Sequence, residues 1–272
     1  MAAPAAGAPV LMTGPDGPWD EVLEPLATRG TVVTYGRVAD WLPEDTGERV
    51  LRPLLGPRDW NRFQRLTHRR VREGFLASRL LLKHTAAKVL SSRPEAVDLA
   101  YKPGGRPYLR GCDQIDISLS HTEEVMVVGV TRRGLLGVDV ERAERPMIGT
   151  GVEFQACTPH ERALLESVPE QARNSAMVRL WTLKEAYSKA IGQGLRFRFT
   201  EFGFTLDDAR IRLQRPDGSP GTGPEWSFGT YALESDYVVS AALRDEGFGA
   251  AADTAADTTL DQTLLGVLLG RL

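Results

Sequence analysis

A single stretch carries most of the chemical information in this chain: Trp181-Thr182-Leu183-Lys184-Glu185-Ala186-Tyr187-Ser188-Lys189. The sequence continues with Ala190-Ile191-Gly192-Gln193-Gly194-Leu195, in which the glycines are expected to end a helix. One acid, Glu185, therefore lies between two lysines on the same helix. Carboxylates with cations close by are typical of sites that bind phosphate and metal ions.

Helical periodicity places Met177 and Leu180 on one apolar face and puts Glu185 and Lys189 at its border. A Glu–Lys pair four residues apart on a solvated surface is the simpler interpretation, and it contributes only ~0.2–0.5 kcal/mol. Lys184 does not fit that interpretation, because it falls in the middle of the apolar face. A buried ammonium needs an anionic partner. We therefore expect acids, a metal site or a polyanionic ligand near this helix.

A second acidic element lies upstream, in the strand-like run Gly137-Val138-Asp139-Val140-Glu141. Residues two apart in a strand project from the same face, so Asp139 and Glu141 point together while the valines point to the other side. Mg²⁺ commonly takes one or two protein carboxylates and completes its shell with water and substrate phosphate. The pair fits that requirement, although an exposed strand face with ordinary charges is the alternative interpretation.

Composition limits the class of protein. The chain has 272 residues, of which 42% are hydrophobic, and this is enough for one large domain or two closely packed halves. A formal net charge of −3 argues against a protein that coats nucleic acid or an anionic membrane. No apolar run approaches the ~18 residues that a membrane-spanning helix needs.

Cysteine and histidine are sparse, with two and four copies respectively, and they show no spacing typical of a zinc site. This cysteine usage and the absence of a secretion signal in residues 1–18 favour a cytoplasmic location. Residues 1–18 are rich in Ala, Pro and Gly, so we expect them not to pack and to form a disordered extension.

Periodicity predicts an α+β order of elements. A core-facing helix is expected from Val71 to Val89, and a second one from Glu170 to Ile191. Thr158-Pro159-His160-Glu161 has the pattern of a capped helix start. Strands are expected at 115–120, 125–131 and 135–141, as parts of one antiparallel sheet, and at 201–206, 226–233 and 237–243. Residues 246–257 resemble a linker, and 260–272 a short apolar helix.

One edge of the first helix is basic, because Arg65, Arg69, Arg72 and Arg79 fall together beside the apolar stripe. Such an edge is either a solvated helix face, a nucleic-acid patch or a phosphate-binding surface. Arginine forks suit a cofactor that carries several phosphates. Without interleaved aromatic residues and with a net acidic chain, nucleic acid is the weaker interpretation.

These residues resemble the Sfp-type 4′-phosphopantetheinyl transferases. That family shows W-x-x-K-E-[AS]-x-x-K-x-x-G-x-G-L, which is present from Trp181 to Leu195, and G-[IV]-D-[IV]-E, which is present from Gly137 to Glu141. It also shows S-H-[ST] and G-[KR]-P elements, which this chain contains as Ser120-His121-Thr122 and Gly105-Arg106-Pro107. The resemblance runs from about Arg72 to Leu195 and does not extend to the first sixty residues or the tail.

The resemblance implies two similar α/β halves related by a pseudo-twofold axis, which we expect at residues 19–135 and 136–245, with the active site at their junction. Composition marks residues 246–272 as a linker and tail. It implies a monomeric, Mg²⁺-dependent enzyme that transfers the phosphopantetheine arm of coenzyme A to a serine of an acyl or peptidyl carrier protein, in polyketide, nonribosomal-peptide or fatty-acid synthesis. The carrier is expected to be acidic and helical. Adenosine 3′,5′-bisphosphate would be released.

The same resemblance suggests roles for individual residues. Metal ligands would be Asp139, Glu141 and Glu185. Catalysis would involve Glu185, Lys189 and His121, and Glu185 is a candidate base, a ligand or both. Coenzyme A would be bound by Arg72 at the 3′-phosphate, by Gly105, Arg106 and Pro107 at the adenine, and by Ser120, His121, Lys184 and Lys189.

Three alternative functions are compatible with parts of the sequence. Ser120-His121 suggests a hydrolase pair, but no G-x-S-x-G element surrounds the serine. A metal-dependent phosphohydrolase would use the same acids with water as the nucleophile. A regulatory protein would bind coenzyme A without turnover.

Overall fold

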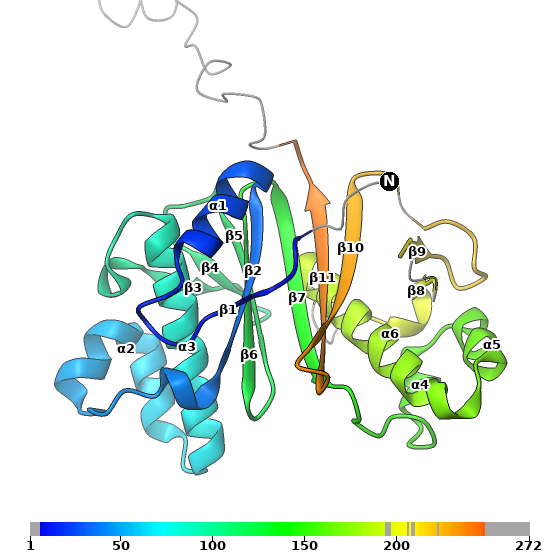
Figure 1. The fold of residues 1–272 in the computed structure, drawn as a ribbon, viewed down its shortest axis with the longest axis horizontal. Helices are drawn as coiled ribbons and strands as arrows, with labels where there is room; N and C mark the ends of the chain where they lie inside the picture. The colour runs from blue at the N-terminus through cyan, green and yellow to red at the C-terminus, as the bar shows by residue number, and fades with distance from the viewer. Residues whose placement is uncertain (1–5, 194–196, 206, 208–209, 222, 248–272) are drawn as a thin grey trace, which may run out of the picture.

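Two β-sheets pack against each other at the centre of the molecule, and a long helix covers the outer side of each (Figure 1). The computed structural model describes residues 6–193, 197–205, 207, 210–221 and 223–247. The first sheet has the order β1-β2-β6-β5 and the second has the order β10-β11-β7. Their strands are β1 (Val10–Leu11), β2 (Thr31–Arg37), β5 (Asp116–His121), β6 (Val125–Thr131), β7 (Gly134–Arg142), β10 (Trp226–Leu233) and β11 (Tyr237–Asp245).

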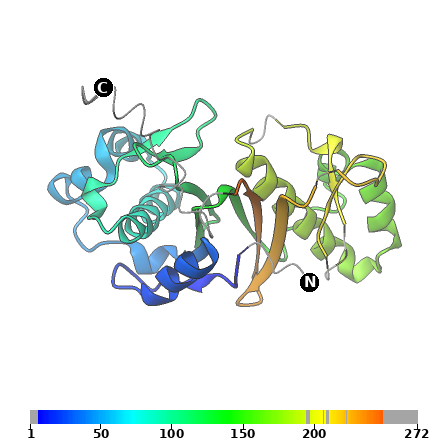
Figure 2. The same ribbon diagram turned by 90° about the horizontal axis from the view of Figure 1, so that it is seen from above.

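The covering helices are α3 (Arg69–Val89) on the first sheet and α6 (Glu170–Ala190) on the second. Seen from above, the two halves lie side by side with β7 between them (Figure 2). The first half also contains α1 (Asp20–Arg29), η1 (Val38–Trp41), α2 (Glu48–Arg65), η2 (Pro94–Ala96) and the paired strands β3 (Leu99–Tyr101) and β4 (Pro107–Leu109). The second contains α4 (Val152–Ala156), α5 (Pro159–Ser167), η4 (Phe199–Glu201), β8 (Gly203–Phe204) and β9 (Leu213–Gln214).

Strand β7 serves both halves because its two faces pack on different partners. Leu136, Val138 and Val140 join Val127 and other residues of the first sheet in an apolar layer between the sheets. The opposite face lies against α6, and Gly137 is its closest point. A Cβ atom added at Gly137 would lie 1.8 Å from the carbonyl oxygen of Ala186. Only glycine permits this distance between the strand and the helix backbone.

Most of the helices and strands that local sequence patterns predict are present in the structure. The helices expected from Val71 and from Glu170, the capped start at Thr158 and the strands at 125–131, 226–233 and 237–243 are all present. The expectation of one sheet for the three central strands is wrong. Strand β7 pairs along its length with β11 instead of β6. This pairing is set by long-range burial of both faces of β7, which local periodicity does not reveal.

The N-terminal segment does not show the disorder that its composition predicts. Residues 6–18 are ordered, since β1 pairs with β2 and the Trp41 indole donates a 3.0 Å hydrogen bond to the carbonyl of Met12. Met12 is fully buried. Residues 1–5, Gly194 and Leu195 of the motif, and the expected tail helix at 260–272 lie outside the described residues.

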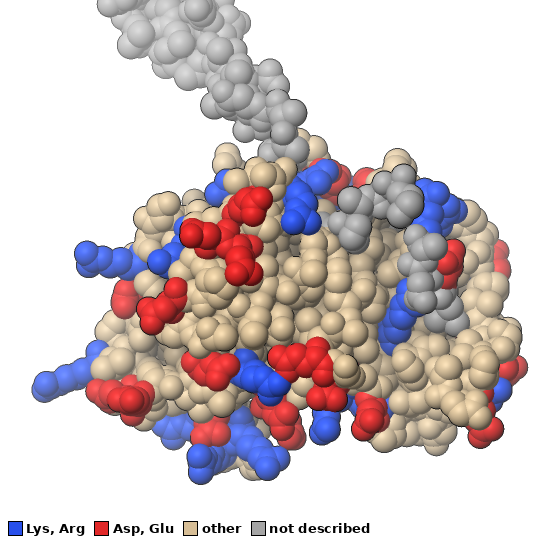
Figure 3. Space-filling view, in the orientation of Figure 1, with Lys and Arg blue, Asp and Glu red and all other residues tan. Residues whose placement is uncertain are grey.

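The described surface shows no strong bias of charge on the face seen in Figure 3, where basic and acidic side chains intermingle around an uncharged centre. Among the helices of the described part, none combines the length and the apolar character that crossing a membrane requires.

Lys184 is fully buried, and its anionic partner is a side chain of the protein. The Lys184 ammonium lies 2.8 Å from the Glu161 carboxylate and donates to the carbonyl oxygens of Phe199, at 2.7 Å, and Phe202. Glu161 also accepts hydrogen bonds from the backbone N–H groups of Thr158 and Phe204. The sequence correctly indicated a buried lysine that needs an anion. The further expectation that Lys184 binds coenzyme A is corrected, because its donors are used within the core of the second half.

We predict that Lys184→Met lowers the free energy of unfolding by about 3–5 kcal/mol, because it leaves the Glu161 carboxylate buried without its cation. Urea denaturation measures the change. Arg52→Met is the matched control, since Arg52 pairs with Glu48 at an exposed site, where such pairs contribute about 0–1 kcal/mol. Equal losses in the two variants would contradict the buried ion pair.

We also predict that Gly137→Ala destabilises the protein by about 1–3 kcal/mol or more, because the new methyl group forces α6 away from β7. Gly104→Ala is the control. A Cβ there would meet the carbonyl oxygen of Gly192 at 3.6 Å, an ordinary contact. If Gly137→Ala unfolds at the same urea concentration as the wild type, the close packing of β7 on α6 is not required.

Candidate active site

A pocket of about 440 Å³ lies where the two halves meet. Its walls come from the loop between β3 and β4, from β5 and from the C-terminal part of α6. The lining residues are Gly104, Gly105, Arg106, Pro107, Ser118, Leu119, Glu185, Lys189, Gly192 and Gln193. Four of these, Gly105, Arg106, Pro107 and Lys189, were expected from the sequence to bind the cofactor, and Glu185 was expected to be catalytic.

The β3–β4 loop turns tightly to reach this pocket. The Lys102 N–H donates to the carbonyl of Arg106 at 2.9 Å, and Gly105 has a φ of 85°, in the region that favours glycine. Gly105 and Pro107 are thereby presented to the pocket with little side-chain bulk.

Arg106 fastens the loop to the second half. Its guanidinium donates to the carbonyl oxygens of Lys189 and Ala190 at the end of α6, to the carbonyl of Leu136 at 3.0 Å, and to the carboxylate of Asp116. The last carbonyls of a helix lack partners within the helix and attract cations. Arg106 therefore has a structural role at the junction, in addition to any contact with a ligand.

Ser120, Asp139 and Lys189 form a hydrogen-bonded group across the junction. Asp139 Oδ1 accepts hydrogen bonds from Ser120 Oγ and Lys189 Nζ, both at 2.7 Å. Lys189 also donates to Ser120 Oγ at 2.9 Å and to the carbonyl of Val138 at 3.2 Å. These bonds hold the ammonium at a defined position on the pocket wall.

Glu185 is the unusual acid of this site. Its side chain is 8% exposed, and Oε1 is buried with no hydrogen-bond partner in the described part of the chain. Burial, reinforced by the charge of Asp139, raises the pKa of Glu185 to about 7, while Lys189 and Arg145 oppose the shift. Folding therefore favours the protonated acid. The free energy of unfolding falls as the pH rises from 4.5 to about 7, because Glu185 ionises readily in the unfolded chain but not at its buried site. An orphaned oxygen of this kind is available to a ligand.

Glu141, the third expected metal ligand, is engaged elsewhere. Its carboxylate accepts a hydrogen bond from the Arg145 guanidinium and another from the N–H of Arg142 at 2.9 Å. Within the described ranges, no group of three or more His, Cys, Asp and Glu side chains is arranged to hold a metal ion. The three-carboxylate set is therefore not assembled as a metal-binding group in this structure.

Two carboxylates still fit a divalent cation. The charge of Asp139 raises the pKa of Glu185, and Glu185 offers an oxygen without a donor. Mg²⁺ commonly takes only one or two protein carboxylates, with water and substrate oxygens completing the shell. The residues present therefore agree with a Mg²⁺ ion bound mainly by Asp139 and Glu185.

His121 and Arg72 lie at the edge of the site. His121 ends β5 on the exposed side, with Nδ1 3.2 Å from the carbonyl oxygen of Thr122. Partial burial lowers its pKa, and the cations Arg79, Lys189 and Arg62 add to the shift. Arg72 is exposed on α3, where its guanidinium lies 4.2 Å from the ring centre of Phe63. Neither residue lines the pocket.

Sequence interpretation missed three residues that build the site. Asp116 and Ser118 accept hydrogen bonds from the N–H groups of Leu136, at 2.7 Å, and Val138, at 3.0 Å. Together with Ser120 they occupy alternate positions of β5, a period-two polar pattern that was available as a signal. Arg145, which pairs with Glu141, lies in a connecting segment and had no such pattern.

The chain is similar to one known protein family and to several named proteins. Residues 135–242 match the family model described as the 4′-phosphopantetheinyl transferase superfamily. A phosphopantetheinyl transferase of Thraustochytrium sp. is 28% identical over 225 residues, which is 76% of each chain. The 4′-phosphopantetheinyl transferase of Bacillus subtilis is 24% identical over 57% of this chain and 68% of its own length. The 4′-phosphopantetheinyl transferase HetI of Nostoc sp. is 28% identical over 70% of this chain and 76% of its own length.

The matched region begins at β7 and ends within β11, so it contains Asp139, Glu141, Glu185 and Lys189. The relatives extend the similarity into the first half. These matches support the assignment of the chain as an enzyme, a phosphopantetheinyl transferase, and the match to the superfamily model covers residues 135–242.

Proposed function

We propose that this enzyme, of the Sfp type, transfers the 4′-phosphopantetheine arm of coenzyme A to a serine of an acyl or peptidyl carrier protein and requires Mg²⁺. The observation that carries the proposal is Glu185, a buried carboxyl with a free oxygen and a pKa of about 7, beside Asp139 and Lys189 in the junction pocket. The family match adds independent support.

The pocket suggests how coenzyme A is oriented. Gly105 and Pro107 would contact the adenine, while Ser120, Lys189 and His121 would contact phosphates. Arg72 would meet the 3′-phosphate at the exposed edge of α3. Asp139 and Glu185 would hold Mg²⁺, with Glu141 joining them only after leaving Arg145. When bound, Mg²⁺ supplies neutralisation of the charge on the pyrophosphate oxygens.

The chain's own residues account for proton and charge movement. The carrier serine must lose a proton as it attacks the β-phosphorus, and Glu185, whose pKa is about 7 in the metal-free site, is suited to accept it. Lys189 is fixed by Ser120, Val138 and Asp139, so its positive charge is already positioned for the departing bisphosphate.

The test incubates the enzyme with coenzyme A, Mg²⁺ and an unmodified carrier protein, and follows the mass of the carrier. We expect the carrier to gain one phosphopantetheine group. Hydrolysis of coenzyme A without modification of the carrier would favour the phosphohydrolase, and tight binding without turnover would favour the regulatory protein.

Glu185→Gln should reduce the rate of transfer by about 10²–10⁴-fold, the range for loss of an acid–base group. Glu170→Gln, an exposed position at the other end of α6, is the matched control and should stay within about twofold. Circular dichroism confirms that both variants fold. A near-normal rate in Glu185→Gln would remove this residue from the mechanism.

A further inference from the structure

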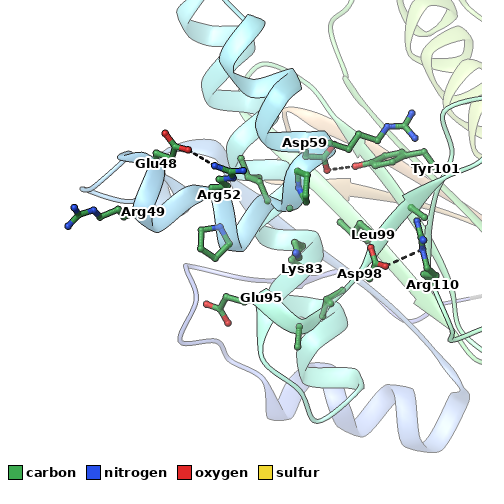
Figure 4. A pocket seen from close by; sticks show the side chains of 18 of the residues that line it. Glu48, Arg49, Arg52, Asp59, Lys83, Glu95, Asp98, Leu99, Tyr101 and Arg110 are labelled. Atoms are coloured by element: carbon green, nitrogen blue, oxygen red, sulfur yellow. Dashed lines mark hydrogen bonds and ion pairs between the residues drawn. The ribbon is translucent and has the colours of Figure 1, made fainter.

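A second and larger pocket lies in the first half, apart from the candidate active site. It has a volume of about 1350 Å³ and opens between α2 and the segment that contains η2 and β3 (Figure 4). It shares no lining residue with the junction pocket. Lys83, from α3, contributes to its wall between these two elements.

Lys83 is a buried cation without a direct partner. The residue is 2% exposed, yet among the described side chains and carbonyls its ammonium makes no hydrogen bond and no ion pair within 4.0 Å. Lys184, by contrast, has Glu161 and two carbonyl oxygens around it. The Lys83 Nζ atom is not one of the fully enclosed polar atoms that lack a partner, so it is reached from the pocket that Lys83 lines. Burial of the rest of the side chain lowers the pKa of Lys83.

The acids that face Lys83 either pair with other cations or lie at the exposed rim of the pocket. Asp59 on α2 binds Tyr101 and lies 3.3 Å from Arg79, and Asp98 lies 3.1 Å from Arg110. Glu95 in η2 is exposed. All three charges act on Lys83 from beyond ion-pair distance. A ligand anion that reaches the pocket wall would supply the contact that these acids do not.

The rest of the lining limits the kind of anion. Five acidic and five basic side chains line the pocket, so its charges balance and a dianion is not favoured. Apolar surface comes from Val97, Leu99 and Tyr108 among others. Ligand pockets typically combine such apolar walls with a few fixed polar groups.

We propose that this pocket binds small molecules that carry one carboxylate on an apolar chain, with the carboxylate at Lys83 and the chain along the wall formed by Val97, Leu99 and Tyr108. The site is independent of the proposed transferase activity, because it shares no residue with the junction pocket.

Isothermal titration calorimetry of the full chain with octanoate tests the proposal. We expect one octanoate per chain and an affinity about tenfold or more above that for octanol, because a hydrogen bond to a charged partner contributes at least that factor. Octyl phosphate, a dianion, should bind more weakly than octanoate. Equal binding of octanoate, octanol and octylammonium to the wild type would overturn the proposal without any variant.

Lys83→Met should weaken octanoate binding about tenfold or more and should not lower the thermal stability, since it removes a buried charge that has no partner. Lys88→Met, at an exposed position of the same helix, is the matched control and should bind octanoate like the wild type. Unchanged affinity in Lys83→Met, or no binding to the wild type, would show that Lys83 does not form an anion site.

Discussion

The close approach of β7 and α6 at Gly137 is the constraint on which the candidate site depends. Gly137 has no side chain to separate the strand from the helix, so the backbones meet at a distance that no other residue allows. This contact brings Asp139, two residues further along β7, next to Glu185 and Lys189 on α6. The other face of β7 packs on the first sheet. One strand thus positions the acids and joins the two halves.

Polar contacts at the junction combine structural and chemical roles. Asp116, Ser118 and Ser120 on β5 bind groups of β7, and Arg106 links the β3–β4 loop to the end of α6. Nearly every polar group there has a partner, as buried polar groups require. The free oxygen of Glu185 is therefore informative, because its neighbours are satisfied while it is not. A buried acid in this situation is a candidate for ligand binding or proton transfer.

Sequence periodicity predicted the elements but not their long-range partners. The helix from Glu170 and the strand 125–131 were predictable because their apolar patterns are local. The pairing of β7 with β11 was not, since it joins strands about a hundred residues apart and depends on burial of both faces. Likewise, the need of Lys184 for an anion was predictable from its position, whereas the identity of that anion as Glu161 was not. Five of the predicted site residues, Gly105, Arg106, Pro107, Glu185 and Lys189, do share one pocket.

The titration of the Glu185 carboxyl group is the decisive measurement for the site. In metal-free protein labelled with ¹³C at the glutamate side chains, the resonance absent from Glu185→Gln identifies this residue. Burial beside Asp139 predicts a midpoint of about 7, with the protonated form present below that pH. A midpoint near the ordinary value of 4.5 would mean that Glu185 is solvated and distant from Asp139, which would contradict the arrangement of the site.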